Sequence, residues 1–250
     1  MRARARLHPF PLVVLAAAAG VLLIAGAHAL SRTGESGGNP LFWLGIVLIV
    51  IPASLIITSS SANRNERAAT VVLVGLGLYA AKVLRDPFMF TFGDEFVHFI
   101  NLQQISGTGR LFGENSLLPI TPQYPGLEAL TQGIASTGVC SPFAAGIAVV
   151  AAARALFMLT VFLIYERMTG SSRVAGIGAL ITTAAPTFLY FSAQFSYESL
   201  AIPLGMLGIF TVVRRQTAVD ARERRAWGTV LVLTAAGLVA THHLTTYAFL

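Results

Sequence analysis

Residues 40–61, PLFWLGIVLIVIPASLIITSSS, decide the class of fold. This run of 22 residues carries no charged side chain, and about 20 apolar residues suffice to cross the hydrocarbon core of a bilayer. The whole chain shares this character, because it is 55% hydrophobic and only 11% charged, with a mean hydropathy of +0.71. A soluble domain carries about 25% charged residues. The sequence therefore predicts a polytopic membrane protein built only from helices.

Other apolar runs predict further spans at 9–30, 68–85, 141–165, 174–191, 197–213 and 228–250. The expected fold class is an all-α bundle of about seven transmembrane spans, with a long outer loop that carries short interfacial helices. The first run follows three arginines and ends in AGAHA, so cleavage as a signal peptide after Ala29 is the alternative to an uncleaved span. Because apolar sequence continues to Leu250, we expect the N-terminal portion of a longer protein.

The basic residues predict the orientation of the chain in the membrane. With a cytoplasmic N-terminus, the outer segments hold only Arg32 and Arg110, as the positive-inside rule requires. The inner segments then hold twelve of the seventeen basic residues: Arg2, Arg4, Arg6, Arg64, Arg67, Arg167, Arg173, Arg214, Arg215, Arg222, Arg224 and Arg225. We expect a multi-pass protein of the cell membrane whose long loop, 86–140, is extracytoplasmic. The +6 net charge is explained by these short loops, so nucleic acid is not an expected partner.

The chain is expected to divide into a two-span hairpin, 1–67, and a membrane domain, 68–250, that contains the outer loop. Within this loop, DEFVHFINLQQI (94–105) and GLEALTQGIASTG (126–138) predict short helices. The prolines of PITPQYP (119–125) predict an extended segment, because each disfavours a helical conformation in the residue before it. The single cysteine, Cys140, excludes an internal disulfide.

Three ionisable residues at the start of the outer loop are the first candidate site. Asp94 and Glu95 are adjacent, so on a helix they point about 100° apart. One would act as a base or metal ligand while the other caps the helix or binds Arg110. His98 lies four residues after Asp94, on a shared helix face. The plain alternative is that Asp94 only occupies the first helical turn, where the helix dipole favours an acid.

The outer histidines extend this candidate site. Topology brings His242 and His243 to the same membrane face, so Asp94, His98 and His242 are a candidate site for Mn, Mg or Zn. The two adjacent histidines can instead contact a phosphate, and an acid and a histidine at this spacing often only share a solvated helix face.

Further polar residues lie at the predicted membrane boundaries. Tyr197 and Glu198 form an outer corner, although Glu198 is also typical of a first helical turn after a serine N-cap. Lys82 and Arg85 could hold a lipid phosphate or extend to the membrane surface. Arg154, near the middle of a span, is either paired inside the bundle or extends to the surface.

The motifs GDEFVHF (93–99), PQYPGLEAL (122–130), FSYESLAIPL (195–204) and THHLTT (241–246) follow one another on the outer side. In this order and sidedness, residues 70–250 resemble the C-type, multi-spanning glycosyltransferases, which use sugars linked to polyprenyl phosphate as donors. The resemblance implies that Asp94, with Glu95 as the alternate, deprotonates or orients a glycan or protein acceptor. The acceptor attacks the anomeric carbon, polyprenyl phosphate leaves, and the configuration inverts.

The resemblance also implies how the substrates are bound. Substrate-binding candidates are Lys82, Arg85, His98, Arg110, Tyr124, Tyr197, Glu198, His242 and His243. Some family members use a divalent metal at this site. The chain departs from the family pattern because its long outer loop follows the third span, whereas the family's generally follows the first. The competing hypotheses are a transporter or flippase, and a metal-dependent hydrolase, although no HExxH or GxSxG element is present.

Overall fold

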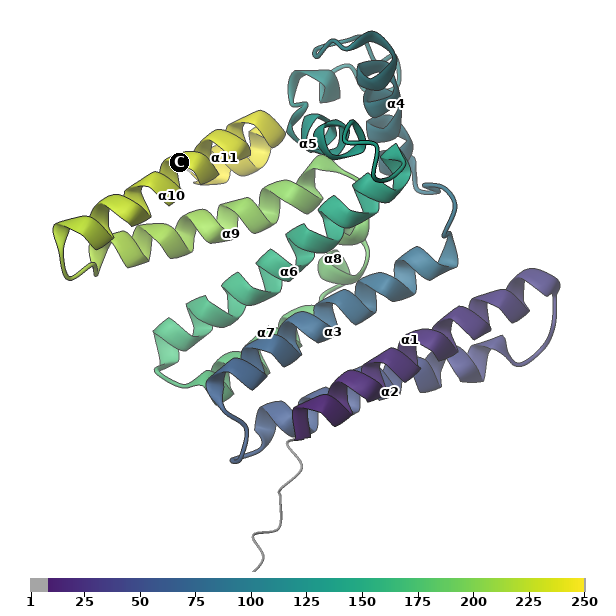
Figure 1. Cartoon of the computed structure of the whole chain (residues 1–250), viewed down its shortest axis with the longest axis vertical. Coiled ribbons are helices and arrows are strands. Elements are labelled where there is room, and N and C mark those ends of the chain that lie inside the picture. Colours follow the sequence, from purple (N-terminus) through teal and green to yellow (C-terminus); the bar gives the residue numbers. More distant parts are fainter. Residues whose placement is uncertain (1–8, 250) are drawn as a thin grey trace, which may run out of the picture. The chain divides into compact units, whose positions relative to one another are not determined.

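The computed structural model describes residues 9–249, and every regular element in that range is helical (Figure 1). The prediction of an all-α protein is confirmed. Two 3₁₀ turns, η1 and η2, accompany the α-helices. The elements are α1 Pro9–Thr33, α2 Gly38–Thr58, α3 Arg64–Arg85, α4 Gly93–Thr108, η1 Thr121–Gln123, α5 Gly126–Ala135, α6 Pro142–Thr169, α7 Ser172–Thr183, α8 Pro186–Leu189, η2 Phe191–Ala193, α9 Tyr197–Gln216, α10 Ala221–Thr241 and α11 His243–Phe249.

Several of these helices have the length and composition of membrane spans. Within residues 9–249, five qualify: α1, α2, α3, α6 and α9. A sixth qualifies if α7 and the segment Pro186–Ala193 are one broken span. The seventh expected span, 228–250, forms two helices, because the backbone is extended at His242, between α10 and α11. The chain is thus a helical membrane protein with five or six candidate spans.

The chain forms two compact units. The N-terminal unit comprises 1–85 and 162–184, and the C-terminal unit comprises 86–161 and 185–250. The expected domain boundary at residue 67 falls inside the N-terminal unit, where α3 packs against α1, α2 and α7. Long-range packing therefore groups α3 with the hairpin that precedes it.

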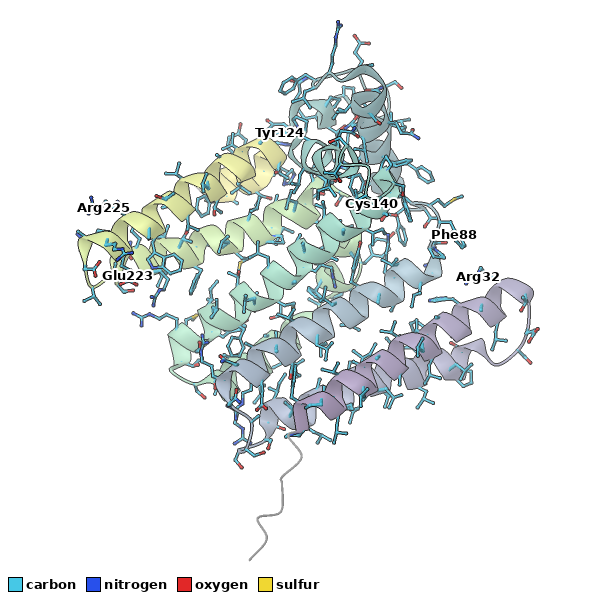
Figure 2. All side chains as sticks on the ribbon, viewed as in Figure 1. Arg32, Phe88, Tyr124, Cys140, Glu223 and Arg225 are labelled. Atoms are coloured by element: carbon cyan, nitrogen blue, oxygen red, sulfur yellow. The ribbon has the colours of Figure 1, made fainter. Side chains whose placement is uncertain are left out.

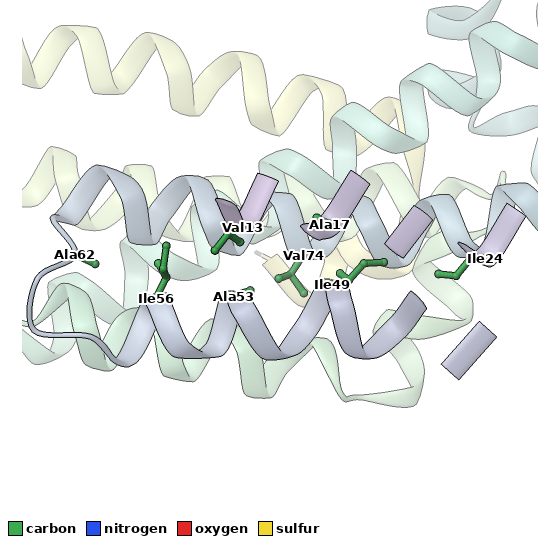
Figure 3. Close-up of a cluster of buried hydrophobic side chains, with 8 residues drawn as sticks. All are labelled: Val13, Ala17, Ile24, Ile49, Ala53, Ile56, Ala62 and Val74. Atoms are coloured by element: carbon green, nitrogen blue, oxygen red, sulfur yellow. The ribbon is translucent and has the colours of Figure 1, made fainter. Parts of the chain in front are cut away.

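An apolar core and one arginine hold the N-terminal unit together. Helices α1 and α2 form an antiparallel hairpin (Figure 1). Arg67 donates from Nε to the carbonyl of Ile57 (3.1 Å), from Nη2 to that of Ser59 (2.7 Å), and from Nη1 to Ser172 Oγ (3.0 Å). It thereby joins α3 to the end of α2 and the start of α7. The apolar cluster in Figure 3 consists of Val13, Ala17, Ile24, Ile49, Ala53, Ile56, Ala62 and Val74.

Two glycines set the close approach of α1 and α2. A Cβ atom on Gly20 would lie 2.6 Å from the carbonyl oxygen of Gly45, and a Cβ on Gly45 would lie 2.6 Å from that of Gly20. Membrane helices often have small residues where they contact one another. In lipid the hydrophobic effect does not drive helices together, and close packing of their backbones provides the attraction instead. We expect Gly20→Val to destabilise the N-terminal unit by about 2–3 kcal/mol through overpacking.

The chain offers a matched control for Gly20→Val. A Cβ on Gly26, in the same helix, meets no atom within 4 Å, so Gly26→Val should change stability far less. Unfolding by sodium dodecyl sulfate would be followed by Trp43 fluorescence in a Trp227→Phe background. Equal shifts for the two valine variants would contradict the predicted backbone contact.

Candidate functional site

Glu95 is buried at the start of α4 and binds backbone N–H groups from two parts of the C-terminal unit. Its Oε2 accepts hydrogen bonds from the N–H groups of Thr91 (3.1 Å) and Phe92 (3.2 Å), and its Oε1 accepts one from Phe195 (3.0 Å). Asp94 is exposed. Of the two roles that the sequence left open for this acidic pair, Glu95 takes the capping role and Asp94 is accessible.

His98 is also buried, and both of its ring nitrogens are engaged. Its Nδ1 lies 2.7 Å from Glu128 Oε1, and its Nε2 accepts the backbone N–H of Tyr197 at 3.4 Å. The amide of Asn101 donates to the same oxygen of Glu128 at 3.3 Å. These partners fit a ring that carries its proton on Nδ1 and donates it to the carboxylate. His98 therefore joins α4 to α5 and to the first turn of α9.

Glu128 is a site residue that the sequence reasoning missed. It is fully buried in α5, and its second oxygen, Oε2, has no hydrogen-bond partner among the described residues. The available signal was its place in GLEALT, where Leu127 and Thr131 are also buried and define the inward face of α5. An acid on such a face requires a polar partner, which His98 and Asn101 supply.

A second group of polar side chains folds the outer loop onto α4. Asn115 donates from Nδ2 to Asn101 Oδ1 (2.7 Å), and Asn101 donates from Nδ2 to Thr121 Oγ1 (3.0 Å). The predicted extended conformation of 119–125 is wrong at its centre, where Thr121–Gln123 form η1. Pro122 suits this turn because its φ is already helical and a first-turn residue needs no N–H donor.

Five of the predicted site residues form one continuous row of rings. His98 meets Tyr197 edge-on with ring centroids 4.5 Å apart, and Tyr197 stacks on His242 at 4.3 Å. The ring centroids of His242 and His243 are 5.2 Å apart, and His243 stacks on Tyr124 with centroids 4.9 Å apart. We call these five residues the ring row. It joins α4, α9, the α10–α11 junction and the loop before α5.

A partly exposed acid lies beside the ring row. Glu198 Oε1 lies 3.8 Å from His242 Nε2, beyond hydrogen-bonding distance, and the Glu198 side chain is 39% exposed. The other nitrogen of His242, Nδ1, lies 2.7 Å from Thr245 Oγ1. Gly126 permits the approach of α10, because a Cβ there would lie 2.5 Å from Thr241 Oγ1. Glu198 is thus a partly exposed acid beside the buried ring of His242.

The remaining predicted site residues lie elsewhere. Arg110 is exposed in the turn after α4, outside the ring row. Lys82 and Arg85 end α3 and belong to the N-terminal unit. Within residues 9–249 no group of three or more His, Cys, Asp and Glu side chains is arranged to hold a metal ion. With both nitrogens of His98 engaged, the Asp94–His98–His242 set does not fit a metal site as placed, and a metal requirement stays a prediction.

Arg154 is paired inside the protein, one of the two alternatives that its sequence position allowed. It is buried in α6 and donates from Nη1 to the carbonyl oxygen of Phe188 (2.9 Å) and to Ser192 Oγ (3.2 Å). Its guanidinium carbon also lies 3.9 Å from the centroid of the Phe188 ring. Arg154 therefore binds the short helical segment that precedes α9.

Comparison with known proteins leaves the site to be interpreted from its own geometry. No family model matches the chain, and no curated protein or solved structure matches it. The site is therefore defined by the four sequence motifs and by the contacts among their side chains.

Proposed function

We propose that this chain carries the catalytic part of a membrane glycosyltransferase, which moves a sugar from a polyprenyl-phosphate carrier to an extracytoplasmic glycan or protein acceptor. One observation carries the proposal: the four motif segments, far apart in the sequence, contribute side chains to one connected cluster. GDEFVHF bonds to FSYESLAIPL through Glu95 and His98. FSYESLAIPL stacks on THHLTT, and THHLTT stacks on PQYPGLEAL.

Asp94 is the proposed base because it is exposed at a turn that its neighbour holds in place. The carboxylate of Glu95 accepts three backbone N–H bonds, so we assign it to positioning rather than to proton transfer. Asp94 would take the proton from the acceptor hydroxyl or amide as that group attacks the anomeric carbon. The bond from that carbon to the phosphate oxygen breaks, and the polyprenyl phosphate leaves with the electron pair.

The outer histidines are the proposed contacts of the leaving phosphate. In the described part of the chain, His242 Nε2 and His243 Nδ1 are buried without hydrogen-bond partners. Either nitrogen can donate to a phosphate oxygen when it carries a proton. Donors placed where charge develops are the usual source of transition-state stabilisation. Tyr124 and Tyr197 stack on these rings and would keep them oriented.

The test is sugar transfer from a polyprenyl-phosphoryl donor by the purified full-length protein. We expect Asp94→Asn to lower the transfer rate by about 10²–10⁴-fold, the usual contribution of a general base, with unchanged unfolding by detergent. Glu114→Gln is the control, because Glu114 is an exposed acid of the same loop. Undiminished transfer by Asp94→Asn would remove Asp94 from this role, and absence of transfer by the unmodified protein would reject the glycosyltransferase itself.

A transporter or flippase is the second candidate, and Arg154 favours it. A buried cation that contacts a broken helix is typical of substrate pathways in transporters. Here Arg154 binds α8, which follows the break at 184–185. The test is the flux of a lipid-linked sugar into proteoliposomes. If Arg154→Gln abolishes this flux and Asp94→Asn leaves it intact, the result would favour a transporter or flippase over a glycosyltransferase.

A further inference from the structure

The turn between α9 and α10 concentrates positive charge outside the candidate site. Residues 214–225 contain five arginines and two acids. Glu223 is committed to the turn: it pairs with Arg214 at 2.8 Å and accepts hydrogen bonds from the N–H of Val219 and the ring N–H of Trp227. The hydrogen bond from Val219, then that from Trp227 and the charge of Arg214, lower the pKa of Glu223. The other acid, Asp220, caps α10.

Three of the arginines keep their charge available. Arg215, Arg224 and Arg225 are exposed, and within residues 9–249 no ion pair is found for any of them. They line an open surface groove of about 1010 Å³. Figure 2 labels Arg225 near the N-terminal end of α10. Like charges gathered on one groove repel one another, so an anion bound between them would relieve that repulsion.

The rest of the groove is apolar. Val232 and Leu233 lie further along α10, and each is 68% exposed. Gly228 lies between the arginines and this apolar part along α10 and also lines the groove, and a Cβ there would make ordinary contact with Arg215 Nε at 3.5 Å. The groove therefore offers cationic side chains at one end and hydrocarbon contact at the other.

We propose that this groove binds one anionic phospholipid, with its phosphate on Arg215, Arg224 and Arg225 and an acyl chain along Val232 and Leu233. Guanidinium groups match phosphate oxygens with paired N–H donors. A free phosphate ion would use only the basic end and leave the apolar end uncovered, whereas a phospholipid uses both. The proposal is independent of the glycosyl-transfer function.

The test measures how closely chosen lipids approach Trp227, which is next to Gly228. In a Trp43→Phe background, Trp227 is the single tryptophan and its fluorescence is quenched by brominated acyl chains. The purified protein would be reconstituted in phosphatidylcholine and titrated with brominated phosphatidylglycerol or brominated phosphatidylcholine. We expect about 10²-fold tighter association of phosphatidylglycerol, of the order that three interfacial arginines provide.

Two pairs of variants separate the groove from general charge. Combined Arg215→Gln, Arg224→Gln and Arg225→Gln should lower the preference to about twofold or less, whereas Arg222→Gln, an exposed arginine outside the groove, should keep it. Gly228→Leu should lower the preference with no change of charge. Gly228→Ala, whose Cβ makes only ordinary contacts, should keep it.

Each contrary result rejects the proposal. A preference that survives the triple substitution, or is lost equally with Arg222→Gln, would show that the groove arginines do not select the lipid. If Gly228→Leu leaves the preference for phosphatidylglycerol intact, the lipid does not bind in the groove. Displacement of phosphatidylglycerol by excess inorganic phosphate would identify a simple anion site. Unfolding curves of all variants would confirm that each remains folded.

Discussion

Glu95→Ala is expected to destabilise the C-terminal unit by about 3–5 kcal/mol. The substitution leaves the buried N–H of Phe195 and the partly buried N–H groups of Thr91 and Phe92 without their acceptor. An unsatisfied buried group costs about 1–3 kcal/mol, and a lost helix cap costs about 0.5–2 kcal/mol. Two of these groups belong to the start of α4 and the third precedes α9, so a local cap and a long-range contact are lost together. Trp227 fluorescence in a Trp43→Phe background would follow the unfolding by sodium dodecyl sulfate.

Two further substitutions make this prediction specific. Glu95→Gln should have an intermediate effect, because its amide oxygen can still accept from Thr91 and Phe92 while its NH₂ group would face the N–H of Phe195. Asp94→Ala, the exposed neighbour, should cost less than about 1 kcal/mol, as surface changes usually do. If Asp94→Ala were as destabilising as Glu95→Ala, the assignment of the cap to Glu95 would be refuted.

Removing one partner of the His98–Glu128 pair is the second large expected effect. Glu128→Ala should cost about 2–4 kcal/mol, because the Nδ1–H of the neutral His98 ring would stay buried without an acceptor and each such group costs about 1–3 kcal/mol. Asn101 would lose an acceptor at the same time. His98→Ala should cost a similar amount and should also release the backbone N–H of Tyr197, which His98 accepts.

A double-mutant cycle measures the interaction itself. The combined His98→Ala and Glu128→Ala variant should be less destabilised than the sum of the two single variants, by about 1–3 kcal/mol. The same Trp227 reporter applies, and Glu114→Ala is the matched change of an exposed acid in the outer loop. Strict additivity of the two changes would show that the 2.7 Å contact contributes nothing to stability.

The contacts in the structure give several candidate site residues other roles than their residue types alone suggested. Glu95 and His98 have their polar atoms engaged within the fold and hold α4, α5 and α9 together. Asp94 is exposed, and Glu198 is partly exposed beside the buried ring of His242. In the proposed glycosyltransferase, the chemistry would belong to Asp94, with Glu198 and the outer histidines as substrate contacts.

The helical, membrane-spanning class of the protein follows from the sequence by itself. The apolar run at 40–61 is longer than a bilayer core requires, and a lipid-exposed segment must satisfy its backbone hydrogen bonds internally, which a helix does. The helical pattern of 94–105 and of 126–138 likewise predicted α4 and α5, since helical periodicity is a local property.

Only the tertiary structure decided which side chain of each polar group faces inward. Asp94 and Glu95 are adjacent acids in the sequence, and Glu95 is held inward by local bonds to Thr91 and Phe92 and by a bond to Phe195, one hundred residues away. The burial of Glu128 likewise depends on His98, thirty residues earlier in the chain. A hydrophobic pattern specifies a helix and its apolar face, whereas the partner of a buried polar atom is set by the neighbour that packing brings within hydrogen-bonding distance.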